Sequence, residues 1–165
     1  MKISVKLGDL KNEIAEAIVV SLFEEKGLED KTIQELDRAL GGIIKELWEA
    51  GDFKGKADQL SIFYPRGAIP GKRVALVGLG KEEKFSSDKL REAAGRASKH
   101  LQKLGVKSFS TMVPGIKGTG FSPFAAAQAF IEGSILGTYQ FKEYKTGNKE
   151  EVKEIEEVCL VEIES

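Results

Sequence analysis

Few residues in this chain could hold it together through disulfides or metal ions. Among its 165 residues there is one cysteine, Cys159, and one histidine, His100. A single cysteine excludes an intramolecular disulfide and any cluster of cysteine ligands, and a single histidine excludes the paired histidines of an HExxH zinc site. No apolar run approaches the roughly 20 residues of a membrane helix. Because the first six residues also lack a signal-peptide core, we expect a soluble cytoplasmic protein.

Charge of either sign is not in excess. The 25 basic residues nearly balance the 26 acidic ones, which leaves a net charge of -1. This balance argues against a dedicated nucleic-acid binder, because such proteins carry a strong basic excess. Hydrophobic residues make up 41% of the chain, and a domain of this size removes roughly 70% of its unfolded surface from water. Without linker-like segments or internal repeats, residues 1–165 are predicted to form a single domain.

Six short segments have the pattern of β-strands. Residues 3–7 alternate apolar and polar side chains, which is typical of a half-exposed strand. Residues 17–23 are an almost unbroken apolar run rich in β-branched side chains, which predicts a strand buried on both faces. The other predicted strands are residues 59–64, 73–78, 109–113 and 158–161.

The first helical pattern starts after the second strand. Thr32 offers an N-cap with Glu35 at the capping-box spacing, and apolar residues continue at helical spacing to Leu47. Gly41-Gly42 falls inside this predicted helix, where each glycine should cost about 1 kcal/mol relative to alanine. A close approach of the helix to the sheet would explain the pair.

Two further helices are predicted later in the chain. Residues 88–104 carry one narrow apolar stripe, and Gly105 ends the helix. The stripe consists of Leu90, Ala93, Ala94, Ala97, Leu101 and Leu104. Ser122-Pro123 provides an N-cap followed by proline at the first helical position of an alanine-rich helix. Strands alternating with helices predict a three-layer α/β/α sandwich with a mixed, largely parallel sheet, in which residues 17–23 and 73–78 form central strands.

Gly78-Leu79-Gly80 follows a strand and precedes a helix, as a dinucleotide-binding fingerprint would. The third glycine of that fingerprint is replaced by Glu83, which would repel a pyrophosphate. A phosphate-binding P-loop fails as well, because Lys81 is followed by Glu82 in place of serine or threonine. We interpret these glycines as a tight turn at the carboxyl end of the strand.

Residues 115–120 form a more suggestive glycine-rich segment. Gly115-Ile116-Lys117-Gly118-Thr119-Gly120 lies between a predicted strand and the Ser122-Pro123 helix start, where free backbone N–H groups can hold an anion. The same glycines equally suit a plain surface connection, so both interpretations stay open.

The remaining candidates have structural explanations. His100 falls on the flank of its helix and is interpreted as a surface residue, and Cys159 within an apolar strand as a buried, inert thiol. Trp48 lies off the main stripe of the first helix and covers its edge or an interface. The acidic residues near the chain end are interpreted as a solvated face; they are Glu150, Glu151, Glu154, Glu156 and Glu157. We therefore assign no catalytic, binding or metal-ligating residue to this chain.

Three stretches together resemble the N-terminal domain of the leucyl aminopeptidase, or cytosol aminopeptidase, family. The first is Gly51-Asp52-Phe53-Lys54-Gly55-Lys56, and the second is Arg73-Val74-Ala75-Leu76-Val77-Gly78-Leu79-Gly80-Lys81. The third, residues 129–141, is similar to a family helix that ends in Gly-Thr-Tyr and an aromatic residue. Their order and spacing cover most of the chain.

The resemblance implies a macro-domain-like fold that precedes a separate metallopeptidase domain. It further implies an enzyme that removes N-terminal residues with two divalent metal ions, manganese or zinc, and works as a hexamer. The family signature Asn-Thr-Asp-Ala-Glu-Gly-Arg is absent, because the only asparagines are Asn12 and Asn148. The chain is thus expected to be a non-catalytic N-terminal domain with an assembly or substrate-access role, without a metal of its own, whose partners are its catalytic domain and further copies.

Two other classes of function are alternatives to the aminopeptidase domain. A stand-alone macro-like module would bind ADP-ribose or another anionic ligand, but such modules typically carry an Asn-Ala pair where this chain has Glu24 after its second strand. A nucleic-acid-binding role would rest on a local basic surplus, which a solvated helix face explains; its residues are Lys84, Lys89, Arg91, Arg96, Lys99, Lys103 and Lys107.

Overall fold

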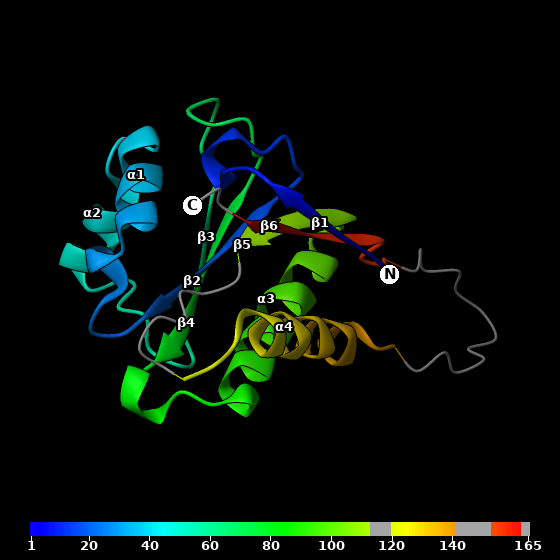
Figure 1. Cartoon of the computed structure of the whole chain (residues 1–165). Helices are drawn as coiled ribbons and strands as arrows, with labels where there is room; N and C mark the ends of the chain where they lie inside the picture. The colour runs from blue at the N-terminus through cyan, green and yellow to red at the C-terminus, as the bar shows by residue number, and fades with distance from the viewer. Residues whose placement is uncertain (113–119, 141–152, 163–165) are drawn as a thin grey trace.

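A computed structural model describes residues 1–112, 120–140 and 153–162 of the chain. Within them, six strands form one sheet in the order β1-β6-β5-β2-β4-β3 (Figure 1). Every neighbouring pair is parallel except β3 and β4, which are antiparallel. The strands are β1 (Lys2–Leu7), β2 (Ile18–Phe23), β3 (Leu60–Phe63), β4 (Val74–Gly80), β5 (Ser108–Met112) and β6 (Glu157–Glu162). The predicted mixed, largely parallel sheet is confirmed, and β2 and β4 are interior strands.

Helices cover both faces of this sheet, which confirms the three-layer sandwich (Figure 1). One face carries α1 (Lys31–Ala39) and α2 (Ile43–Ala50), and the other carries α3 (Ser87–Lys103) and α4 (Pro123–Thr138). Single 3₁₀ turns at Leu10–Asn12, Gly27–Glu29 and Glu82–Lys84 complete the described elements. None of the helices in these parts of the chain combines the length and apolar character needed to cross a membrane.

The central strands feed two separate cores. Val19 and Ala75 point toward α3 and α4, whereas Ile18 and Leu76 point toward α1 and α2. Successive residues of a strand face opposite sides of the sheet, so a strand with helices on both sides is apolar at nearly every position. This is why residues 17–23 lack the alternation of residues 3–7.

The first predicted helix is two helices. Gly41 and Gly42 have φ angles of 78° and 88° and stand between α1 and α2. A Cβ on either glycine would meet nothing within 4 Å, so the predicted close approach to the sheet is wrong. The pair is there because left-handed backbone favours glycine. The buried carboxylate of Asp37 stabilises the turn by accepting hydrogen bonds from the amides of Ile44 (2.7 Å) and Lys45 (3.2 Å).

The predicted start of α1 is also wrong. Asp30, and not Thr32, is the N-cap, and its carboxylate accepts hydrogen bonds from the amides of Thr32 (2.8 Å) and Ile33 (3.2 Å). Aspartate and threonine are both good N-caps, and the aspartate two residues earlier starts the helix before Thr32. Two other predicted helix ends are confirmed: Ser122 caps α4 with Pro123 in its first turn, and Gly105 follows α3 with φ 81°. Leu104, however, is 43% exposed and is no part of the core.

Helices α3 and α4 cross at glycines. A Cβ on Gly133 would lie 2.6 Å from the Cα of Arg91, and one on Gly137 would lie 2.5 Å from the Cα of Gly95. Around this crossing, the hydroxyls of Ser98 and Ser134 are hydrogen-bonded at 2.9 Å. The glycines of residues 129–141 therefore allow two helix backbones to touch, a role that helix propensity alone would argue against.

Candidate functional site

The edge where the parallel strands end is the first place to look for a ligand. In open α/β sheets, ligands bind outside the carboxyl ends of the strands, where neighbouring strands send their connections to opposite faces. Strand β2 leads to α1, and its neighbour β4 leads to α3 on the opposite face (Figure 1). The carboxyl ends of β2 and β4 are therefore the candidate site.

The backbone of residues 55–59 lies across the end of β4. The amide of Gly80 donates to the carbonyl oxygen of Gly55 at 2.9 Å, and the amide of Gly78 donates to that of Gln59 at 3.0 Å. A Cβ on Gly78 would overlap the carbonyl oxygen of Lys56. The interpretation of residues 78–80 as a tight turn is wrong, because β4 continues through Gly80. Gly78 is needed for a close backbone approach.

The end of β2 is covered by the same segment. A Cβ on Gly55 would lie 2.8 Å from the carbonyl oxygen of Phe23, and Gly55 itself has a φ of 74°. The amide of Glu24, the residue after β2, donates to the carbonyl oxygen of Gly80 at 2.9 Å. Two of the three stretches that carry the family resemblance thus form one unit that closes the carboxyl ends of β2 and β4.

Three phenylalanines fill the neighbouring part of this edge. The ring centroids of Phe23 and Phe85 are 5.2 Å apart, and those of Phe85 and Phe121 are 5.1 Å apart, both in edge-to-face geometry. They come from the end of β2, the segment before α3 and the segment before α4. Such aromatic pairs are worth about 0.5–1.5 kcal/mol beyond the area they bury. The cluster occupies space beside β2 with protein side chains.

An ion pair bridges the loops at the same edge. The ammonium of Lys26 lies 3.0 Å from the carboxylate of Glu82. The hydrogen bond to Glu82 raises the pKa of Lys26 above its usual value. The ammonium of Lys26 is thus paired with the carboxylate of Glu82, and a phosphate group placed beside Lys26 would meet the negative charge of Glu82. Of the glycine-rich segment 115–120, only Gly120 lies within the described residues.

Trp48 covers the base of α2. Its ring lies edge-to-face with the buried ring of Phe53, at a centroid distance of 6.2 Å. A Cβ on Gly27 would lie 2.8 Å from the indole ring. Trp48 was expected to cover the edge of its helix or an interface; its contacts with Phe53 and Gly27 agree with the first, and Gly27 leaves room for the indole ring.

A buried carboxylate that sequence reasoning missed lies on the α1–α2 side of the sheet. Glu13 is only 5% exposed, accepts a hydrogen bond from the hydroxyl of Ser110 (3.1 Å) and pairs with the ammonium of Lys6 (2.7 Å). The hydrogen bond to Glu13 raises the pKa of Lys6. Glu13 ties the segment before β2 to β1 and β5. Nothing in its local sequence distinguishes it, because Ser110 is 97 positions away.

The other candidate residues do not converge on a site. His100 is exposed, as predicted. Cys159 was predicted to be buried but is only half-buried. Glu154 and Glu156 are exposed, and Glu157 accepts a hydrogen bond from Ser4 at 3.0 Å; Glu150 and Glu151 lie outside the described residues. Residues 1–112, 120–140 and 153–162 contain no group of three His, Cys, Asp or Glu side chains placed to hold a metal ion.

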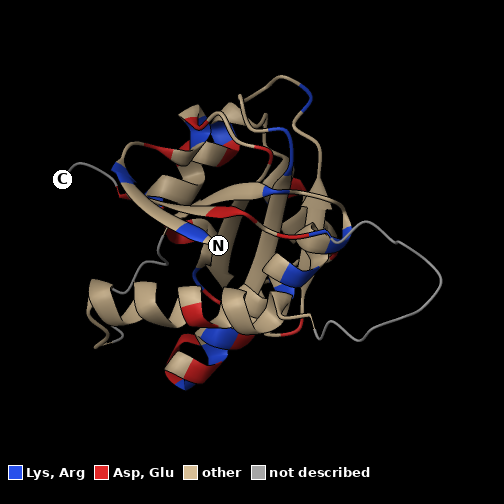
Figure 2. Cartoon of the chain, turned by 90° about the vertical axis from the view of Figure 1, so that its right-hand side faces the viewer, with Lys and Arg blue, Asp and Glu red and all other residues tan. Residues whose placement is uncertain are grey.

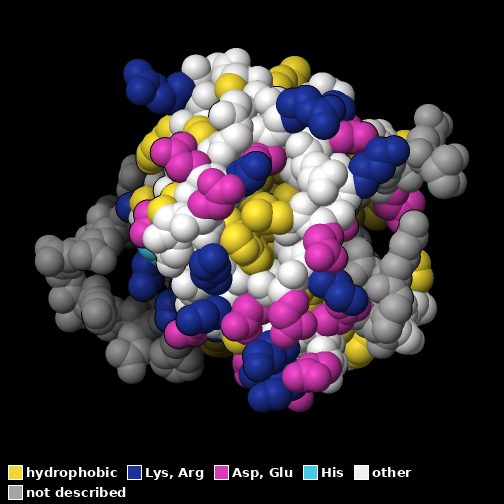
Figure 3. Space-filling model, turned by 90° about the vertical axis from the view of Figure 1, so that its left-hand side faces the viewer, with side chains coloured by type: hydrophobic (Ala, Val, Ile, Leu, Met, Phe, Trp, Pro, Cys, Tyr) yellow, Lys and Arg dark blue, Asp and Glu magenta, His cyan; other side chains and the backbone are white. Residues whose placement is uncertain are grey.

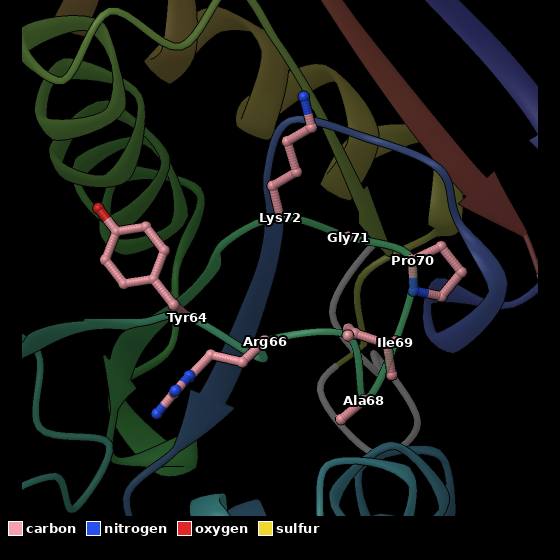
Figure 4. Close-up of a pocket in the computed structure, with 8 residues that line it drawn as sticks. Tyr64, Arg66, Ala68, Ile69, Pro70, Gly71 and Lys72 are labelled. Carbon is pink, nitrogen blue, oxygen red and sulfur yellow. The ribbon is translucent and has the colours of Figure 1, made fainter.

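Two surface hollows lie elsewhere on the described part of the chain. One, of about 560 Å³, lies along residues 64–72 between β3 and β4. Figure 4 shows that the side chains of Tyr64, Arg66 and Lys72 point away from one another there, so they do not form a convergent set. The other lies beside α1 and is lined by Leu28, Ile33, Gln34, Asp37, Arg38 and Lys45. On the face that carries α1 and α2, a small apolar patch is surrounded by side chains of both charges (Figure 3).

The fold and this edge define a macro-domain-like α/β/α sandwich. A Trypanosoma brucei macrodomain in complex with ADP-ribose has a TM-score of 0.69 at 15% identity, and the match covers 96% of this chain and 62% of that one. A tomato leucine aminopeptidase mutant has a TM-score of 0.78 at 19% identity, covering 98% of this chain and 32% of that one.

The sequence comparison is more specific. Residues 19–148 match the N-terminal domain of the cytosol aminopeptidase family, and the chain belongs to that family. A probable cytosol aminopeptidase of Roseiflexus castenholzii is 35% identical over 162 residues, which are 98% of this chain and 30% of the relative. A second, of Geotalea uraniireducens, is 33% identical over 161 residues, 98% of this chain and 32% of the relative. The chain therefore spans about a third of the length of these relatives.

Proposed function

We propose that this domain is the non-catalytic N-terminal part of a metal-dependent leucyl aminopeptidase, and that it serves assembly or substrate access. The observation that carries the proposal is the family match over residues 19–148, together with relatives of which the chain spans only about 30%. In this proposal residues 1–165 are a single domain without catalytic, binding or metal-ligating residues. The parent enzyme is a cytoplasmic hexamer that releases N-terminal amino acids from peptides.

The chemical requirements of the reaction support a catalytic site outside this domain. Metal-assisted peptide hydrolysis needs an activated water and, in a two-metal site, several ligands converging on ions about 3.5–4 Å apart. Among the described residues, the two buried carboxylates already have partners: Glu13 pairs with Lys6, and Asp37 accepts hydrogen bonds at the start of α2. We therefore place the two manganese or zinc ions in the catalytic portion of the polypeptide.

Activity assays on two proteins test the catalytic part of the proposal. The full-length parent should hydrolyse leucine p-nitroanilide in the presence of manganese or zinc and lose that activity to a chelator. The purified 165-residue chain should not hydrolyse it with either metal. Metal-dependent turnover by the short chain, after contaminating peptidases are removed, would contradict the two-domain interpretation.

Deleting the domain tests its role. If residues 1–165 serve assembly, a parent lacking them should sediment as a smaller oligomer than the intact enzyme. If they serve access, the shortened enzyme should stay hexameric but show a changed KM for peptides of different length, with little change for leucine p-nitroanilide. A shortened enzyme that is unchanged in both measurements would leave the domain without the proposed role.

The alternative function is a binding module for ADP-ribose or another anionic ligand, which the likeness to macrodomains favours. Against it stand the phenylalanines at the carboxyl edge and Glu24, where an amide side chain would be needed to contact a ribose. We expect calorimetric titration with ADP-ribose to show weak binding or none. A dissociation constant in the low micromolar range, about -8 kcal/mol, would favour the binding module instead.

A further inference from the structure

Helix α4 is apolar on both of its faces. Its inner face, with Ala129, Phe130 and Gly133, packs on the sheet and α3. Its outer face, together with the residue that follows the helix, carries large apolar side chains with high exposure. They are Phe124 (78% exposed), Ile135 (49%), Leu136 (70%) and Tyr139 (74%). We call these four side chains the outer α4 face.

Almost no charge interrupts the outer α4 face. Glu132 is the one charged residue of α4, and its carboxylate is taken up by Arg91 of α3 (2.8 Å) and by Gln128 (3.0 Å). In Figure 2, α4 is the long, mostly tan helix, whereas α3 beside it carries both blue and red. Gln128 and Glu132 lie on the same side of the helix, between Phe124 at its start and the three apolar residues near its end. Large exposed apolar side chains gathered on one helix face mark an interaction surface.

The topology places the start of α4, with Phe124, at the carboxyl edge of the sheet, the edge at which β6 ends. Strands β5 and β6 are parallel, so their carboxyl ends share one edge. Strand β5 leads to the start of α4, and β6 is the last described strand (Figure 1). At that edge Val5 and Leu7 of β1 are also 61% and 62% exposed, and Leu7 pairs with Glu162 at the end of β6. In the relatives, about two-thirds of the polypeptide lies outside the matched part.

We propose that the outer α4 face is the surface on which the catalytic portion of the aminopeptidase packs. This inference rests on the proposed function, because it takes the occupant to be the polypeptide beyond this domain. The occupant must present mostly apolar side chains, since the polar side chains between the four, Gln128 and Glu132, are already hydrogen-bonded to each other and Glu132 also to Arg91. Packing there would fix the domain through the same helix that crosses α3 at Gly133.

The test measures thiol labelling in the full-length parent. Leu136→Cys and Phe124→Cys introduce thiols on the outer α4 face, and Ile14→Cys introduces one at an apolar position that is 90% exposed and away from α4. Peptide mass spectrometry after a maleimide pulse gives the labelling rate at each site. We expect labelling at 124 and 136 to be about tenfold or more slower than at 14, because the core of an interface excludes solvent and reagent. Equal rates at all three sites would overturn the proposal.

A crosslink identifies what covers the face. A benzophenone attached at Leu136→Cys in the parent should, on illumination, link to a peptide from beyond residue 165. Links only to peptides of residues 1–165, and none to a peptide beyond them, would overturn the proposal. Hydrolysis of leucine p-nitroanilide by the unmodified parent separates the two questions: an inactive parent refutes the proposed function, whereas an active parent with fast labelling refutes only the docking surface.

Discussion

Replacing Gly133 by alanine tests whether the α3–α4 crossing depends on backbone contact. The added methyl group would overlap the carbonyl oxygen of Arg91 and lie 2.6 Å from its Cα. Both atoms belong to the backbone of a 17-residue helix, so no side-chain rotation relieves the overlap and the helices must move apart. Overpacking of this kind costs about 1–3 kcal/mol of stability. We expect a cost near the upper end, because the methyl group meets backbone atoms of α3 that cannot rotate away.

Helix propensity acts in the opposite direction. Alanine is better than glycine in a helix interior by about 1 kcal/mol, so the expected net loss in the free energy of unfolding is about 2 kcal/mol. For a domain of this size, that loss corresponds to a Tm lower by about 4–8 °C. Urea denaturation followed by circular dichroism measures the loss directly, and an unchanged m-value would show that the change is in stability.

A matched pair on the same helix isolates the propensity contribution. Gln128 is exposed on α4, and Gln128→Ala and Gln128→Gly both remove its hydrogen bond to Glu132. Their difference should therefore favour alanine by about 1 kcal/mol. If Gly133→Ala is as stable as the wild type or more so, while the Gln128 pair behaves as expected, the helices do not need backbone contact and the reasoning is refuted.

Three further predictions concern single contacts. Gly78→Ala should lower stability by at least about 2 kcal/mol, because the added Cβ would overlap the carbonyl oxygen of Lys56. Gly8→Ala is the control and should be near neutral, because no atom lies closer than 3.6 Å to the added Cβ. Equal urea midpoints for the two variants would contradict this prediction. Asp37→Ala should lower the free energy of unfolding by about 1–2 kcal/mol, because it removes the carboxylate that caps the start of α2. In thermal unfolding, Asp37→Ala should have a lower Tm than the milder variant Asp37→Asn. The hydrogen bond from Arg91 lowers the pKa of Glu132 below its usual 4.5. The ion pair therefore adds stability above pH 4.5, and this contribution is lost as the pH falls through the lowered pKa. In urea denaturation, the difference in stability between wild type and Glu132→Gln should shrink in acid, and a constant difference from pH 7 to pH 3 would refute the pairing.

The periodic patterns of this sequence determined most of the architecture. An almost unbroken apolar run at residues 17–23 predicted a strand covered on both faces, because successive residues of a strand face opposite sides of the sheet. The apolar stripe from Leu90 to Leu101 and the Ser122-Pro123 cap predicted α3 and the start of α4 for the same local reason. The three family-like stretches were readable as well, since they are contiguous in the chain.

Tertiary structure decided what the glycines and the buried carboxylates do. Gly41 and Gly42 separate two helices, Gly78 admits the carbonyl of Lys56, and Gly133 admits the backbone of α3. A glycine in the sequence offers both conformational freedom and absent volume, and only the backbone that arrives from elsewhere shows which of the two is used. Glu13 is the same case for charge: its burial is compensated by Lys6 and Ser110, and the partner 97 positions away is brought to it only by the order of strands in the sheet.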